Sequence, residues 1–255
     1  MPVLSTVGGA SLRAFGAFRA TSASPFIVAT GGTVYVDPTD ADFKIHQFTT
    51  SDTFAITTSP LLSTIQLMMI GGGGGGGSGG GGAGGYIYRP SFSIGVGSYS
   101  VVVGSGGVFS FNGGNTTFSG LIALGGGGVN SQGGSGGGAI GQSGGAGLQP
   151  TSASGGFGNK GGDWGYSGGN DGGGGGAGTA GSIPAGGAGR VADIINSSGT
   201  AQVLAQGGYG NQDSTSFALP AVLANSGNGG WGGGYSGISF QDGQAGIVRI
   251  RYKFQ

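Results

Sequence analysis

Runs of glycine occupy the middle of this chain and limit what it can fold into. Residues 71–85 read GGGGGGGSGGGGAGG, and 63 of the 70 glycines lie between residues 71 and 240. Each glycine in a helix interior costs about 1 kcal/mol relative to alanine, which excludes a helical domain. Collagen is excluded as well, because glycine does not recur at every third residue and the chain has only eight prolines. The fold must therefore accommodate long stretches of bare backbone.

Charge and composition exclude several functional classes. The positive charges of nine Lys and Arg residues balance the negative charges of nine Asp residues. The chain contains no Glu and no Cys, and His46 is its single histidine. Nucleic-acid-binding chains usually carry an excess of positive charge, and zinc fingers or disulfide scaffolds need cysteine. No apolar run reaches the ~18 residues of a membrane span, and residues 1–20 lack the apolar block of a secretory signal. We therefore expect no nucleic acid among the partners, no membrane insertion and no export signal.

Segments rich in β-branched and aromatic residues flank and interrupt the glycine runs. They predict strands, and turn-forming pairs such as Asp37-Pro38 and Ser59-Pro60 separate the first of them. The segment 65–70 is apolar on both faces, so we expect it inside a sheet. The predicted strands are 33–36, 43–48, 53–57, 65–70, 99–103, 116–118, 121–124 and 246–254.

The closing segment has the clearest strand pattern. A period of two predicts one basic face and one apolar face. The basic face carries Ile247, Arg249, Arg251 and Lys253, and the apolar face carries Val248, Ile250, Tyr252 and Phe254. Such a strand needs partners, and the best candidates precede the glycine region, so we expect the chain to return to its first strands.

Three interpretations of the glycine runs compete. Gly/Ser-rich chains form flexible linkers, but a linker of 170 residues does not explain the well-formed strand that follows it. A phosphate-binding loop needs Gly-Lys followed by Ser or Thr, whereas Lys160 follows Asn159 and precedes Gly161. The third interpretation is a bundle of left-handed helices with three residues per turn, the polyglycine II counterpart of polyproline II. It accounts for all the runs, and we favour it.

Lateral packing is what can order such helices. A glycine loses ~1–2 kcal/mol of backbone entropy on ordering, and one lateral hydrogen bond returns only ~0.5–1.5 kcal/mol. One isolated run should therefore stay unfolded, whereas runs that each bond several neighbours should order. Without side chains, the backbones can approach closely enough for this.

We therefore expect an all-β fold with almost no α-helix, in which a small antiparallel β-sandwich is combined with a bundle of polyglycine II helices. Residues 1–27 would form an N-terminal attachment arm and residues 28–255 a glycine-rich domain. Within it, 28–70 and 241–255 would supply strands, and 71–240 the polyglycine helices with further strands and exposed loops. The predicted loop tips carry large side chains: Phe157, Trp164, Tyr166, Tyr209, Phe217, Trp231, Tyr235 and Phe240.

Landmarks outside the glycine runs resemble a known family. Residues 28–56 read VATGGTVYVDPTDADFKIHQFTTSDTFAI, and a hydrophobic strand then runs directly into the glycine block at Gly71. Further landmarks follow in the same order: YSVVVGSGG at 99–107, NGGNTTF at 112–118, ALGGGG at 123–128 and GIVRIRY at 246–252. Together they are similar to glycine-rich domain proteins of tailed bacteriophages, over about residues 28–255.

The resemblance implies a virion structural protein. Related glycine-rich phage adhesins lie at tail-fibre tips, where polyglycine-type helices hold variable loops against the bacterial surface. A tail-fibre or tail-tip adhesin would bind other virion proteins and a host-surface receptor, either protein or polysaccharide. The alternative is a non-adhesive assembly component such as a fibre segment, head decoration or connector. We expect a homo-oligomer, with a trimer as one form.

Residues on the predicted tips are the candidates for receptor contact, because Tyr and Trp offer large contact areas for little lost entropy. The candidates are Trp164, Tyr166, Asn170, Asp171, Tyr209, Trp231 and Tyr235. The alternative is that these rings cap the glycine bundle. In the arm, the candidates for docking on a partner are Arg13, Phe15, Phe18 and Arg19.

No catalytic arrangement is evident in the sequence. His46 lies in the middle of a predicted strand, where a surface or interface position is expected, and no nucleophile-elbow pattern accompanies it. Asp37, Asp40 and Asp42 lie between two strands, but their spacing fits no standard calcium loop, so turn formation is the expected role. We predict no enzyme activity, no metal site and no cofactor.

Overall fold

The computed structural model describes residues 25–60, 63–165, 170–211, 223–233 and 239–255. In these ranges the elements are β1 (Val28–Thr30), β2 (Thr33–Val36), β3 (Phe43–Phe48), β4 (Asp52–Thr58), β5 (Ser63–Ile70), β6 (Tyr86–Ile94), β7 (Gly97–Val102), β8 (Thr116–Phe118), β9 (Leu121–Ala123), the 3-10 helix η1 (Gln149–Thr151), β10 (Arg190–Val191), β11 (Val203–Leu204) and β12 (Ile247–Lys253). The described ranges contain no α-helix, so the all-β prediction is confirmed. They also contain no helix with the length and apolarity to cross a bilayer.

Two five-stranded antiparallel sheets pack face to face. The β4 sheet has the order β1-β4-β7-β8-β9, and the β12 sheet has the order β2-β3-β12-β5-β6. Side chains from both sheets form one buried cluster between them, as in a β-sandwich. It includes Phe54, Val101 and Phe118 from the β4 sheet and Phe48, Leu67, Ile250 and Tyr252 from the β12 sheet. The predicted small sandwich is therefore present.

The last strand lies at the centre of its sheet. β12 pairs with β3 on one side and with β5 on the other, so the chain does return to its first strands. β5 in turn lies between β12 and β6, which confirms the prediction that it is an inner strand. These long-range pairs mean that the glycine region begins and ends in the same sheet.

Arg249 lies on the predicted basic face of β12 but does not face solvent. This side chain is 2% exposed, because residues 190–205 cover the outer face of the β12 sheet. Its guanidinium donates to the Gln47 side chain at 2.9 Å, the Ile194 carbonyl at 2.8 Å and the Gln202 side chain. Burial lowers the pKa of Arg249. Sequence alternation did not reveal this covering segment because it comes from a distant part of the chain.

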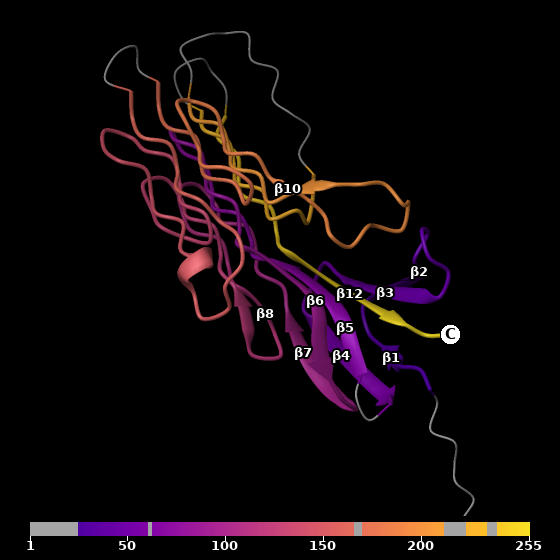
Figure 1. Ribbon diagram of the computed structural model, residues 1–255. Helices are drawn as coiled ribbons and strands as arrows, with labels where there is room; N and C mark the ends of the chain where they lie inside the picture. Colours follow the sequence, from indigo (N-terminus) through magenta and orange to yellow (C-terminus); the bar gives the residue numbers. More distant parts are fainter. Residues whose placement is uncertain (1–24, 61–62, 166–169, 212–222, 234–238) are drawn as a thin grey trace, which may run out of the picture.

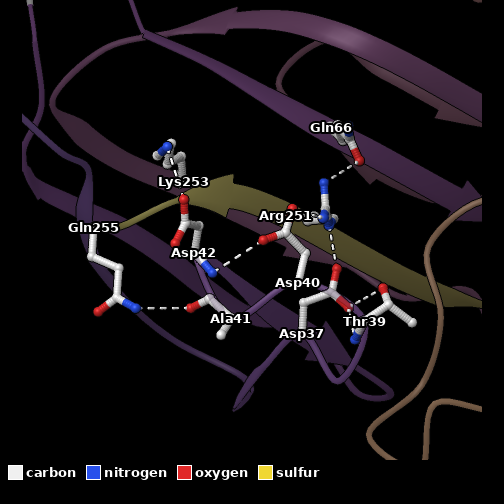
Figure 2. A network of polar contacts seen from close by, with 9 residues as sticks. All are labelled: Asp37, Thr39, Asp40, Ala41, Asp42, Gln66, Arg251, Lys253 and Gln255. Atoms are coloured by element: carbon white, nitrogen blue, oxygen red, sulfur yellow. Dashed lines mark hydrogen bonds and ion pairs between the residues drawn. The ribbon is translucent and has the colours of Figure 1, made fainter.

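A polar network fixes the end of β12 to the loop before β3 (Figure 2). Arg251 pairs with Asp37 at 2.5 Å and lies 3.6 Å from Asp40, and Lys253 pairs with Asp42 at 3.0 Å. Asp37 also accepts hydrogen bonds from the amide and hydroxyl of Thr39. Burial by itself would raise the pKa of Asp37, but the bonds from Thr39 and Arg251 outweigh it and lower the pKa. The expected turn role of these aspartates is what the structure shows.

The glycine runs form an array of extended segments that bond to one another sideways. Within 71–77, successive amides point to three different neighbours, and the pattern repeats every three residues. Gly71 and Gly74 donate to Gly85 and Gly82, Gly72 and Gly75 to Gly114 and Phe111, and Gly73 and Gly76 to Gln244 and Gln241. A period of three without bonds inside a segment is the pattern that the polyglycine II interpretation requires.

The longest glycine block lies at the centre of the array. The segment 79–85 exchanges hydrogen bonds with six neighbours, which surround it on all sides. These neighbours are 71–77, 124–127, 135–138, 172–175, Gly208 and 227–230. Almost all of 71–85 is buried, although its side chains are single hydrogen atoms. We refer to this set of laterally bonded segments as the glycine array.

Close approach, and not backbone conformation, is what requires glycine here. A Cβ built on Gly74 or Gly81 would lie closer than 3.0 Å to a carbonyl oxygen of a neighbouring segment, a distance that real Cβ atoms essentially never show. Neither residue has a φ in the left-handed region that favours glycine. The array therefore depends on the missing side chain itself.

The sandwich and the array lie end to end (Figure 1). Strands of both sheets fill one end of the molecule, and the glycine segments run side by side away from them. We call the sandwich end basal and the opposite end, marked by the turn at Ser78, distal. The C-terminus lies at the basal end, and Pro25 lines the same basal pocket as Lys253. The described chain therefore enters and leaves at one end.

Candidate binding surface

Hairpin turns between the glycine segments gather at the distal end. The segment 71–77 leaves the sandwich and 79–85 returns to it, with Gly77 bonded to Gly79 across the turn. The tip 108–111 lies beside this turn, because the Ser110 amide donates to the Gly76 carbonyl at 3.1 Å. The hydrogen bonds that build the array therefore also set the position of its tips.

Other tips reach the same level. The Asn211 amide donates to the Ser78 carbonyl at 2.8 Å. The Ile140 amide donates to the side chain of Asn130 at 2.7 Å, and the Trp164 amide donates to the Gln142 carbonyl at 3.1 Å. Turns far apart in the sequence thus form one composite surface, which we call the distal surface.

Large apolar side chains project from this surface. Phe111 is 68% exposed and Phe109 48%, on one hairpin tip. Four further exposed apolar residues lie on distal tips: Val108, Ile140, Ile183 and Phe240. Single exposed apolar residues are ordinary, but several gathered at one end are typical of an interaction surface.

One aromatic pair joins two of the tips. The rings of Phe109 and Phe240 lie 4.3 Å apart between centroids, tilted by 51°. The Phe109 amide donates to the Asp242 carboxylate at 3.1 Å. This hydrogen bond orients the tip, so the exposed rings are presented in a fixed arrangement.

The distal surface carries few charges, and Asp163, Asp171 and Asp242 outnumber Lys160 among them. Lys160 is the one basic residue of the described array, and it pairs with Asp163 at 2.6 Å. Hydrogen bonds from Lys160 and from the Gly144 amide lower the pKa of Asp163. A surface of this kind suits an uncharged or apolar partner better than a strongly anionic one.

The predicted contact residues fall into three groups. Trp164, Asn170 and Tyr209 lie at the distal end and are half-buried. Trp231 and Asp171 are buried, with 9% and 5% exposure, so neither offers its full side chain to a partner. Outside the described residues lie Tyr166 and Tyr235, as well as the arm residues Arg13, Phe15, Phe18 and Arg19.

Phe157 is not on a distal tip. Its amide and carbonyl pair with Tyr86 at the start of β6, at the basal end. The guanidinium of Arg190 lies 3.7 Å from the centre of its ring. Phe109 and Phe111 do lie on a tip, but they were not among the predicted tip residues. The signal was the motif VFSF at 108–111, which stands between two glycine segments.

A surface or interface position was expected for His46, and the surface position is wrong because the side chain is buried. Its Nδ1 lies 2.7 Å from the Gly31 carbonyl and its Nε2 lies 2.9 Å from the Tyr252 hydroxyl. The carbonyl only accepts, so Nδ1 donates to Gly31 and Nε2 accepts from Tyr252. Burial lowers the pKa of His46 and raises that of Tyr252 to about 12. Both ring nitrogens are thus engaged in holding the sandwich together.

A pocket lies at the basal end, where the described chain begins. It has a volume of about 180 Å³ and is lined by Pro25, Phe26, Ile27, Pro60, Ser63, Thr64 and Lys253. Its walls are apolar and polar in nearly equal parts. Pro25, Phe26 and Ile27, the last residues of the predicted attachment arm, line this basal pocket.

The sequence comparisons agree with this architecture. The family model of a glycine-rich domain matches residues 49–253, which span most of the chain, from β4 to β12. No curated protein matches the sequence significantly. The buried glycine hairpin, its bonded neighbours and the sandwich strands from β4 onward lie within the matched range, whereas β1, β2 and β3 precede it. The chain therefore belongs to the family of glycine-rich domain proteins.

Proposed function

We propose that this chain is a structural protein of a bacteriophage virion, a tail-fibre or tail-tip adhesin that presents loops for recognition of the host surface. The observation that carries the proposal is that the two ends of the molecule differ. Exposed apolar rings, including Phe109 and Phe111, gather at the distal end, whereas the described chain enters and leaves at the basal end. The sequence resemblance to phage glycine-rich proteins points in the same direction.

The array suits such a role because its rigidity does not depend on which residues occupy the tips. Its segments are held by backbone hydrogen bonds, so a tip can change its residues without changing a packed side-chain core. Phe and Trp rings at fixed positions lose little entropy on binding. No catalytic step is needed in this mechanism: the basal end is attached and the distal surface makes contact.

Binding to cells tests the proposal directly. Fluorescently labelled protein should bind a subset of bacterial strains in flow cytometry. The double variant Phe109→Ser/Phe111→Ser should lose most of that binding, because it removes the most exposed distal rings. Val96→Ser is the matched control, since Val96 is 62% exposed but lies in the turn between β6 and β7 at the basal end. Equal binding by the double variant and the control would contradict a role of the distal surface.

A non-adhesive assembly component is the second candidate, and the basal pocket favours it. A pocket of about 180 Å³, lined in part by residues 25–27, could receive a short segment of a neighbouring virion protein. In that case the protein should bind no bacterial strain. Deletion of residues 1–24 should then prevent incorporation into virions, measured by mass spectrometry of purified particles, while the distal double variant is incorporated normally.

A further inference from the structure

The turn between β1 and β2 is held by one side chain from each sheet. His46 in β3 donates from Nδ1 to the Gly31 carbonyl at 2.7 Å. Asp52 at the start of β4 accepts from the Gly32 amide at 3.0 Å. Both glycines have a positive φ, 112° at Gly31 and 60° at Gly32, which other residues rarely adopt. The turn therefore links the β4 sheet, which contains β1, to the β12 sheet, which contains β2.

β1 is a short strand at the edge of its sheet. It has three residues and pairs with β4 in a register that shifts between Val28 and Ala29. Such strands open more readily than the inner strands of a sheet. β1 directly follows residues 1–27, so it joins the predicted attachment arm to the sandwich. The bonds that hold β1 in place therefore also hold the end of the arm.

Both hydrogen-bond partners of the His46 ring lead to β1. Nδ1 binds Gly31, the residue that follows the strand. Nε2 lies 2.9 Å from the Tyr252 hydroxyl, and the backbone of Ala29 in the strand hydrogen-bonds to the same hydroxyl. The imidazole and the phenol thus hold β1 against the inner face of the β12 sheet.

These hydrogen bonds fit only the neutral ring. Because Nδ1 carries the proton that Gly31 accepts, Nε2 accepts the proton of the Tyr252 hydroxyl. A second proton, on Nε2, would point at the Tyr252 oxygen, and the hydroxyl would lose the acceptor of its own proton. Tyr252 is 2% exposed, so this O–H group would be buried and unsatisfied. Protonation of His46 therefore breaks the arrangement that joins the ring, the hydroxyl and Ala29.

Among the described residues, the groups that face the ring do not offset a positive charge. Phe54 of β4 contacts it edge-on at 5.1 Å between ring centroids, Val34 lies opposite it on β2, and β12 presents the neutral tyrosine hydroxyl. Burial, together with the like charge of Lys44 on β3, outweighs the Nδ1 hydrogen bond and lowers the pKa of His46. Asp52 is exposed, so solvent screens its carboxylate. A charged ring is therefore stabilised only where water reaches it.

We propose that His46 is an acid-sensitive latch: when its ring takes up a second proton, β1 separates from the sandwich while the other strands stay folded. Separation lets water reach the charged ring and the Tyr252 hydroxyl on the side that β1 had covered. Gly32 is the pivot, because its bond to Asp52 persists. The amides of Gly32 and Thr53 lower the pKa of Asp52 below 3.8, so this carboxylate stays ionised where a histidine titrates.

Release of β1 changes the basal end of the molecule. Residues 25–31, fully extended, would add roughly 23 Å to the reach of the arm at ~3.3 Å per residue. Pro25, Phe26 and Ile27 line the basal pocket, so this pocket would lose one wall at the same time. A partner segment bound in the pocket would therefore be released in acid.

Amide hydrogen exchange resolved by residue tests the latch. Protection factors, each referred to the unstructured-peptide rate at the same pH, should fall for residues 28–31 by up to ~10-fold per pH unit between about pH 6.5 and 5. β9, a three-residue strand at the opposite edge of the same sheet, should keep its protection. Equal losses in β1 and β9 would overturn the proposal. So would constant protection of β1 while that of β12 falls, because His46 would then take up its proton only on global unfolding.

A neutral variant assigns the effect to the ring. His46→Gln cannot titrate, so the protection of its β1 should not depend on pH. The same dependence in this variant as in the natural protein would assign the effect to another group and refute the latch.

A disulfide provides a second control within one protein. Thr30→Cys/Ala55→Cys places thiols on paired residues of β1 and β4, and the natural chain has no cysteine. With the disulfide formed, exchange at residues 28–31 should not depend on pH, and the dependence should return after reduction. Persistent dependence in the oxidised protein would contradict separation of β1. These measurements involve no cells, so this inference and the proposed function fail separately.

Discussion

The amide of Gly74 donates to the carbonyl of Gly82 at 2.8 Å, across the two segments at the centre of the glycine array. The carbonyl of Gly74 in turn accepts from the amide of Gly230 at 2.9 Å. One glycine thus joins three segments through its backbone alone. Repeated at every third residue, this relationship replaces the hydrophobic core that the glycine region lacks.

Gly74→Ala should destabilise the fold strongly. Its methyl group would fall within 3.0 Å of the Gly127 carbonyl, so neighbouring segments must move apart. Overpacking of this kind costs about 1–3 kcal/mol or more, and here it also breaks lateral hydrogen bonds. The free energy of unfolding from urea denaturation measures the loss.

Gly95→Ala is the matched control for that substitution. A Cβ on Gly95 meets no atom within 4 Å, and its φ is not in the left-handed region. The variant should unfold like the natural protein or be up to ~1 kcal/mol more stable, because alanine restricts the unfolded chain. Equal losses in the two variants would mean that close packing is not what requires glycine.

Asp37→Asn should cost about 2 kcal/mol. It breaks the largely buried pair with Arg251, although Asp40 stays near that guanidinium. The pKa of Asp37 in the folded protein lies below 3.8. The stability that the Asp37 carboxylate contributes is therefore fully present above pH 3.8 and is lost as the pH falls through this folded pKa. Urea denaturation at pH 7 and pH 3 checks both statements. Asp42→Asn, in an exposed pair with Lys253, should cost no more than ~1 kcal/mol.

His46 should make stability depend on pH near neutrality. Its folded pKa lies below 6.5, because burial disfavours the charged ring and Lys44 adds a like charge. The stability that depends on a neutral His46 is therefore fully present above pH 6.5. It is lost as the pH drops through the folded pKa, and the free energy of unfolding then changes by at most about 1.4 kcal/mol per pH unit. Thermal unfolding between about pH 7.5 and 5 measures this slope. Since His46 is the single histidine, His46→Gln should flatten it, and an unchanged slope would rule out this assignment.

Arg249→Lys should destabilise the cover over the β12 sheet. The guanidinium serves Gln47, Ile194 and Gln202 at once, and a single ammonium group cannot reach all three. We expect a loss of about 1–3 kcal/mol, the usual cost of leaving a buried acceptor unpaired. Thermal unfolding measures it; a change below a few tenths of a kcal/mol would mean that water replaces the lost donors.

Much of the sandwich could be predicted from local pattern. The strands at 33–36, 43–48 and 116–118 have the predicted bounds, because β-branched and aromatic residues between turn-formers decide them locally. β6 was missed, since Pro90 interrupts its pattern and an edge strand tolerates proline. The two-residue strands β10 and β11 are formed by tertiary packing and have too few residues to show a pattern.

The candidate site was predictable only in part. Glycine runs separated by tips indicate where loops occur, but not which side chain turns inward. Trp231 looks like a tip residue, yet its carbonyl accepts from Gln241 and its ring is 9% exposed. Phe111 was not predicted as a tip residue, yet it is the most exposed of the large apolar residues that the structure describes. Burial at a tip depends on neighbouring hairpins, and those come from distant parts of the chain.

Amide hydrogen exchange across residues 71–85 tests the central claim most directly. If the glycine array is ordered by lateral hydrogen bonds, Gly74, Gly81 and their neighbours should exchange as slowly as the core strands β5 and β12, because nearly all of these amides have a buried carbonyl partner. Exchange of the whole 71–85 segment at the rate of an unstructured peptide, with β5 and β12 protected, would contradict it.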